Sequence, residues 1–263
     1  MAGSTQLAGM VSGIAAGAIR VVDLTETLRP EYPTIKLPPQ FGQASPFVKR
    51  QISRYDEAGP AWYWNNFTMS EHTGTHFDAP VHWITGRDVA NGSVDTIDPR
   101  RFIAPACVID CAREVAADAD FILSKELLLR WESAHGRIPA GSWVFLRSDW
   151  RKVAPPDNYT NTDENGAHSP GPDAEAVQWM IRERDVLGFG TECVGTDAGQ
   201  AFRFELQYPC HHLMHGAGRY GLQCMTHLDR LPPTGAVIIA APLKIEDGSG
   251  SPLRVLALVP ADY

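Results

Sequence analysis

Apolar residues fall along this chain in many short runs separated by turn-forming residues, and only a few segments show a helical period. Short apolar runs bounded by Gly, Pro, Asn or Asp are typical of buried strands. The strands predicted in this way cover residues 21–25, 61–68, 104–110, 142–147, 186–191, 219–225, 237–241 and 253–259.

Three helices are predicted between these strands. Ser124 can cap the first, which runs to about His135. Pro172 opens the second, in which apolar residues recur at helical spacing. The third is short and covers residues 209–216. Many short strands with few helices predict a β-rich α/β fold, and the absence of repeats or composition shifts predicts a single domain spanning residues 1–263.

Three segments lie outside these elements. Residues 1–20 predict a peripheral N-terminal helix, because the apolar part is too short to span a bilayer and no basic residue precedes it. Residues 29–48 combine prolines with aromatic residues and predict a rigid, irregular flap. Residues 154–172 are polar and contain prolines, which suggests a lid. The apolar N-terminus and flap predict a homodimer or a larger even assembly.

Composition excludes several partners. The chain has 263 residues, 44% of them hydrophobic and 21% charged, which is ordinary for a soluble globular protein. A net charge of −8 without any basic run disfavours nucleic acid and anionic membranes. The five cysteines form no CxxC pair and indicate reduced thiols in the cytoplasm.

Three of the nine histidines and one aspartate lie within the eleven positions from His72 to His82. Gly74 weakens a helix and Pro80 breaks one, so a helical cluster is disfavoured. Every second residue from His76 onward would share one face of an extended segment. We therefore expect a turn at Gly74 that leads into a short strand with its polar side chains on one face.

These residue types suit a metal ion. His72, His76 and Asp78 offer two neutral nitrogens and one negative oxygen, which Mn²⁺, Zn²⁺ or Fe²⁺ can accept. An ion held by three ligands keeps open positions for water and a substrate carbonyl, which suits catalysis more than structure. The alternative is a histidine-rich surface loop without a metal.

Residues 72–82, HTGTHFDAPVH, resemble the HxGTHxDxPxH signature of the cyclase family of metal-dependent hydrolases. That family includes bacterial kynurenine formamidase and isatin hydrolase, and residues 211–223 resemble the isatin hydrolase branch most. The resemblance implies a swivelling β/β/α fold, with His72, His76 and Asp78 as metal ligands. It implies Mn²⁺, alternatively Zn²⁺, as the ion.

The resemblance also implies that His82 is the general base and acid. An unperturbed imidazole pKa near ~6.5 suits that role. A fourth metal ligand, or a histidine that only supports the ligands, is the alternative for His82.

One departure from the family pattern bears on the number of ions. Formamidases with two metals use a His and, twelve residues later, a Glu for the second ion, and here His211 is followed at that distance by Gln223. An amide lacks the charge that offsets a second dication. We therefore expect one ion per chain, which favours the isatin hydrolase branch over an arylformamidase and leaves both side chains free for substrate or water.

Aromatic residues point to a flat substrate. A small aromatic cyclic amide such as isatin, opened by water to isatinate, would suit stacking walls of this kind. The expected substrate-binding residues are Phe41, Trp62, Trp83, His211, Gln223 and Cys224.

Two other classes were weighed. His76, Asp78 and the distant His211, followed by Arg219, imitate the facial triad of 2-oxoglutarate-dependent iron oxygenases, but that reading leaves His82 unexplained. A non-enzymatic metal-binding protein is the other class. We would expect it to lose a ligand or His82, and none is lost.

Overall fold

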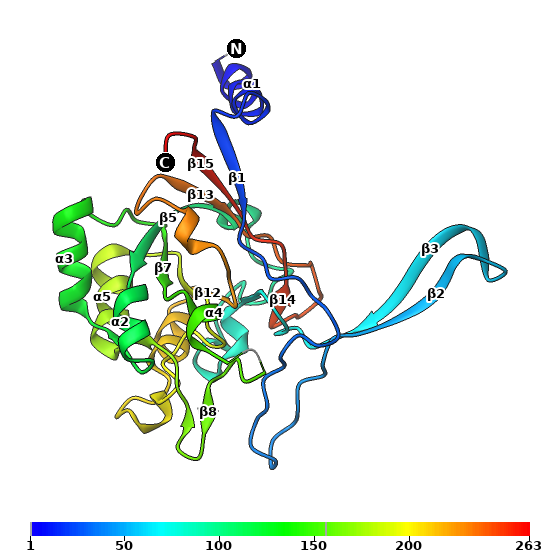
Figure 1. Ribbon diagram of the computed structural model, residues 1–263. Coiled ribbons are helices and arrows are strands. Elements are labelled where there is room, and N and C mark those ends of the chain that lie inside the picture. The colour runs from blue at the N-terminus through cyan, green and yellow to red at the C-terminus, as the bar shows by residue number, and fades with distance from the viewer. Residues whose placement is uncertain (1, 156) are drawn as a thin grey trace.

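One nine-stranded mixed sheet organises the protein, and the computed structural model describes residues 2–155 and 157–263 (Figure 1). The four central strands β5, β7, β11 and β12 are parallel, and the outer ones are antiparallel. In sheet order the strands are β1 (Ile19–Asp23), β15 (Leu256–Pro260), β13 (Ala236–Ile239), β5 (Ile103–Asp110), β7 (Trp143–Arg147), β11 (Gly188–Thr191), β12 (Tyr220–Gln223), β4 (His76–Asp78) and β14 (Gly250–Pro252).

Helices and small strands surround this sheet. The α-helices are α1 (Ala2–Ala15), α2 (Ala112–Ala117), α3 (Lys125–His135), α4 (Trp150–Val153) and α5 (Ala174–Arg184). The 3-10 helices are Pro80–His82, Ile84–Gly86, Pro99–Phe102, Ala201–Arg203 and Leu228–Arg230, and His211–His215 is a π-helix. The remaining strands are β2 (Val48–Asp56), β3 (Gly59–Thr68), β6 (Ile122–Leu123), β8 (Thr162–Asp163), β9 (Gly166–Ala167) and β10 (Gly171–Pro172).

Strand β7 shows why the centre of the sheet reads as a continuous apolar run. Trp143 and Phe145 belong to the core on one face, and Val144 and Leu146 to the core on the other, where α3 and α5 pack. All four side chains are fully buried. Parallel strands covered on both faces have this pattern because neither face meets water.

The predicted fold class is confirmed. The structure is a strand-rich mixed α/β fold, and each of the eight predicted strands overlaps an observed one. Ser124 accepts a hydrogen bond from the Leu127 amide and caps α3 as predicted. The second helix begins later than predicted, because Pro172 pairs in β10 and Asp173 provides the cap.

The predicted strand after the histidine turn ends earlier than expected. Only His76 to Asp78 form a strand, and Pro80–His82 turns into a 3-10 helix. Proline is favourable at the first position of a helix because its φ is fixed and its missing N–H would have no partner there. The prediction that His82 shares an extended face with His76 is therefore wrong.

Two N-terminal segments stand away from the sheet. Helix α1 lies within the predicted residues 1–20 but ends at Ala15, and its Leu7 and Val11 side chains are exposed. The predicted strand at 61–68 forms β3, but it pairs only with β2, in a hairpin that projects from the body of the protein (Figure 1). The flap before this hairpin contains no helix or strand from residue 29 to 47, as expected. No helix in the described part of the chain is long and apolar enough to cross a membrane.

Candidate active site

Strand β4 lies between β12 and β14, and both neighbours place a glycine opposite Asp78. A Cβ atom at Gly221 would lie 2.7 Å from Asp78 Oδ2, and one at Gly250 would lie 2.5 Å from the His72 ring. The two glycines therefore make the space in which this carboxylate and imidazole meet.

The turn before β4 fixes His76. Gly74 has φ +67°, the left-handed conformation that the turn requires. Its carbonyl lies 2.8 Å from His76 Nδ1, so Nδ1–H donates and the lone pair belongs to Nε2. That Nε2 lies 3.4 Å from Asp78 Oδ1. His76 thus presents a lone pair to the carboxylate.

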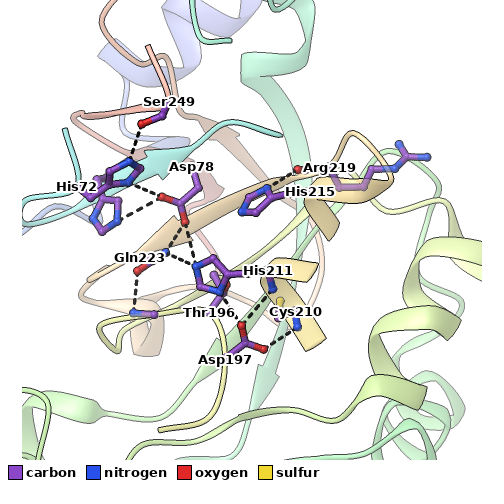
Figure 2. Close-up of polar contacts among 12 residues, drawn as sticks. His72, Asp78, Thr196, Asp197, Cys210, His211, His215, Arg219, Gln223 and Ser249 are labelled. Atoms are coloured by element: carbon purple, nitrogen blue, oxygen red, sulfur yellow. Dashed lines mark hydrogen bonds and ion pairs between the residues drawn. The ribbon is translucent and has the colours of Figure 1, made fainter. Parts of the chain in front are cut away.

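His72 presents a second lone pair in the same place (Figure 2). The Ser249 hydroxyl donates to the Glu71 carboxylate at 2.6 Å, so its oxygen accepts from His72 Nε2–H at 2.9 Å. In the neutral imidazole this leaves Nδ1 without a proton, 2.9 Å from Asp78 Oδ1. A metal ion is what brings such acceptors together, so the residues present fit one.

Asp78 carries the negative charge at this point and is fully buried. Burial alone would raise the pKa of Asp78, but the neighbouring imidazoles of His76, His82 and His72 outweigh it and hold the pKa well below its usual value. A buried carboxylate that stays ionised requires a compensating cation or strong donors. This is the electrostatic condition for a divalent ion.

His82 reaches the site through the 3-10 helix. Its ring centroid lies 4.0 Å from that of His72, and donor atoms of His72, Asp78 and His82 lie within 4.8 Å of one another. Burial, opposed by Asp78, lowers the pKa of His82 to about 3. The imidazole is therefore neutral near pH 7, and burial makes it a weaker base than a free imidazole.

His211 approaches from the opposite side, at the start of the π-helix. Asp197 accepts hydrogen bonds from the Cys210 and His211 amides and from His211 Nδ1, the last at 2.6 Å (Figure 2). His211 Nε2 lies 4.0 Å from Asp78 Oδ2. Burial alone would lower the pKa of His211, but Asp197 and Asp78 raise it. The amide nitrogen of Gln223 lies 3.5 Å from His211 Nε2.

His215 is a site residue that the sequence reasoning missed. Its Nδ1 donates to the Arg219 carbonyl at 3.1 Å, and its Nε2 is buried without a partner. Donor atoms of Asp78, His211 and His215 lie within 4.8 Å of one another. The sequence did contain a signal for His215. His211 and His215 are four residues apart, and residues at that spacing share one face of a helix.

The remaining predicted contacts divide into two groups. Gln223 donates to Asp78, and Trp83 stacks on His211 with ring centroids 4.8 Å apart. Phe41 and Trp62 do not join them in this chain: their side chains are 58% and 49% exposed, on the flap and on the projecting hairpin. The Cys224 thiol is buried beside Tyr32, and burial raises its pKa to about 12.

The cyclase family model matches residues 22–198, so the chain belongs to the cyclase family. The chain is 48% identical over 262 residues to the isatin hydrolase of Roseibium aggregatum, with 99% of both sequences covered. Isatin hydrolase A from Ralstonia solanacearum has 61% identity and a TM-score of 0.94, over 96% of this chain and 97% of that one.

A further solved structure, an isatin hydrolase bound to the product analogue thioisatinate, has 46% identity and a TM-score of 0.96. That match covers 99% of this chain and 100% of the other. The kynurenine formamidase of Erythrobacter litoralis is 27% identical, over 90% of this chain and 93% of that sequence. The expected order of resemblance is confirmed.

Proposed function

We propose that this protein hydrolyses the cyclic amide of isatin to give isatinate. The observation that carries the proposal is the convergence of two imidazole lone pairs on the ionised, buried Asp78, in a chain that matches isatin hydrolases over its full length. Membership of a hydrolase family supports this reading over the oxygenase and over a protein without activity.

His72, His76 and Asp78 would hold one divalent ion, for which the resemblance favours Mn²⁺ over Zn²⁺. When bound, the ion supplies Lewis acidity to the lactam carbonyl and lowers the pKa of a water. The donor set alone does not select between these ions, since both accept two imidazoles and a carboxylate.

The side chains of this chain move the protons. His82, whose ring lies against that of His72 at the donor set, would take a proton from the attacking water as the oxygen bonds to the lactam carbon. An imidazolium with a low pKa is a strong acid, and it returns that proton to the ring nitrogen as the C–N bond breaks. The products are an aryl amine and a carboxylic acid, which releases its proton to water and becomes the carboxylate.

Two further residues would orient the substrate. The His211 ring lies beside the donor set, with Nε2 4.0 Å from Asp78 Oδ2, and can contact the substrate there. The exposed part of the Trp83 ring, beside His211, offers a face on which a flat bicyclic amide can stack. These contacts favour a planar substrate with adjacent carbonyls, as isatin is.

The test is a substrate panel on purified protein whose metal content has been defined. Mn²⁺-loaded protein should open isatin faster than it hydrolyses N-formylkynurenine, and metal-stripped protein should open neither. Absence of isatin turnover in the loaded protein, or preference for the formamide, would contradict the proposal.

We also propose that the chain works in the cytoplasm as a homodimer or larger even assembly. The hairpin exposes several aromatic residues, among them Trp64 and Phe67 at 54% and 60%. Exposed apolar area of this kind is typical of subunit contacts. Phe41 and Trp62 would then contact substrate only by reaching the site of another chain. The five buried, unpaired cysteines support a reducing compartment.

A further inference from the structure

A cavity lies across the sheet from the proposed metal site. In β12, Gly221 and Gln223 face Asp78, so Tyr220 faces the other side of the sheet. Tyr220 lines a cavity of about 580 Å³. The residues that line this cavity do not include His72, His76, Asp78 or His82. The volume is within the range of small-molecule sites.

The wall of this cavity is positively charged in a protein whose net charge is −8. Three guanidinium groups, of Arg100, Arg101 and Arg219, face two carboxylates, of Asp98 and Asp185. Arg100 pairs with Asp98, and Arg219 pairs with Asp185. In the described part of the chain Arg101 has no ion pair.

Arg101 is held in place without being neutralised. Its guanidinium carbon lies 5.2 Å from the centroid of the Tyr220 ring, which orients the planar fork on an aromatic surface. Its Nε is buried without a hydrogen-bond partner, and so is the Nε of Arg219. Neither guanidinium group therefore has all of its donors hydrogen-bonded.

Part of the lining is apolar. Ile97, Ile103 and Leu187 form part of the same wall. An inorganic anion would leave this surface in contact with water, whereas an organic anion would cover it. The cavity therefore combines one unpaired cation with a surface for a hydrocarbon body.

We propose that this cavity is a binding site for a small organic carboxylate. The carboxylate would pair with the Arg101 fork, which matches its geometry, and the apolar body would lie against the isoleucine and leucine side chains. The site is separate from the metal centre and does not depend on the proposed hydrolysis.

The test uses the full-length, metal-loaded protein and isothermal titration with benzoate as probe. Benzoate should bind in the millimolar range or tighter, and benzamide, which has the same shape without the charge, should bind at least about tenfold more weakly. Inorganic phosphate should not displace benzoate. Equal binding of benzamide, displacement by phosphate or no binding of benzoate would overturn the proposal.

Variants locate the probe. Arg101→Met should weaken benzoate binding at least about tenfold, whereas Arg100→Met, at an exposed and already paired neighbour, should change it less than about twofold. Ala90→Trp should block the cavity without removing a charge, which covers the case that Arg101→Met does not fold. His76→Ala should leave benzoate binding intact. Unchanged affinity in Arg101→Met and Ala90→Trp, or lost affinity in His76→Ala, would place the probe elsewhere and refute the site.

Discussion

Gln223 donates a hydrogen bond from its side-chain amide to Asp78 Oδ2, the carboxylate oxygen that faces away from His72 and His76. The direction of this amide is fixed, because its oxygen accepts from the Gly195 amide at 2.7 Å. A cation cannot bind at an amide N–H. The oxygen of Asp78 that a second ion would need is therefore already occupied by a donor.

The first prediction concerns the number of ions. The unmodified protein should contain about one ion per chain, because two imidazoles and one oxygen of Asp78 form a single set of three ligands. Gln223→Glu should raise this number, since it replaces the donor by a negative ligand beside His211, and it should slow isatin opening. Metal analysis by mass spectrometry measures both proteins. Two ions in the unmodified protein would contradict the single-ion reading.

A second prediction separates ligands from neighbours. His76→Ala should remove the ion and lower turnover by more than about 100-fold, since the Lewis acid is lost. His211→Ala should lower the rate but leave the ion in place. His212→Ala, next in sequence but outside the donor set, serves as control. Full metal content in His76→Ala, or loss of the ion in His211→Ala, would be inconsistent with the assigned roles.

The third prediction tests the space beside Asp78. Gly221→Ala should displace the carboxylate, because the new Cβ would lie 2.7 Å from its oxygen. Metal affinity should fall by about 10- to 100-fold, as it does when the support of a ligand is lost. Gly42→Ala is the matched control, since a Cβ there meets nothing within 4 Å. Competitive chelator titration measures both, and equal affinities would refute the packing argument.

The fourth prediction is a pH dependence in the segment proposed as a lid. His168 contacts Asp120 at 2.6 Å and Asp163 at 3.0 Å, and these hydrogen bonds raise the pKa of His168 above its usual value of 6.5. Because the folded pKa is raised, the stabilisation is complete below pH 6.5 and is lost as the pH rises through the folded pKa.

Hydrogen exchange of residues 162–168 measures this effect. Exchange, corrected for its intrinsic pH dependence, should quicken between pH 6 and pH 9. His168→Asn should exchange quickly at both values. The same slope in the wild-type protein and in His168→Asn would exclude His168 as the cause.

The fifth prediction concerns assembly. Analytical ultracentrifugation at micromolar concentration should show a dimer or a larger even species. The reason is that the exposed aromatic side chains of the hairpin would be buried in a contact between subunits. Trp64→Asp should shift the equilibrium toward the monomer, and Leu129→Asp, at an exposed apolar position on α3, should not. A monomeric wild-type protein would refute the proposal.

Local signals made most of the elements predictable. Ser124 is a capping residue in front of an apolar helical pattern. The residues of β7 are continuously apolar, which indicates a strand buried on both faces. Strand β2 was not predicted, because its residues are almost all exposed and show no buried face. A strand that contacts only a partner strand and no core has no buried face, so its sequence does not show the alternation of apolar and polar residues.

The site was predictable where its residues are close in sequence. His72, His76 and Asp78 were proposed from their spacing and lie together in the structure, whereas Asp197 and Ser249 were not proposed. Each of these two fixes the proton position of a histidine through a contact distant in sequence, and no local pattern reports such a contact. The same holds for the glycines opposite Asp78, whose role depends on strand register.

That register has a consequence for the order in which the site is made. Ser249, which orients His72, lies 177 residues later in the chain, and Gly250 pairs with Asp78 from the strand that follows. When residues 72–82 leave the ribosome, neither partner has been synthesised. A slip of one residue between β14 and β4 would also turn Asp78 toward the core. An ion bound there would therefore be captured by a finished sheet, and residues 72–82 would form no metal pocket of their own while the chain is being made.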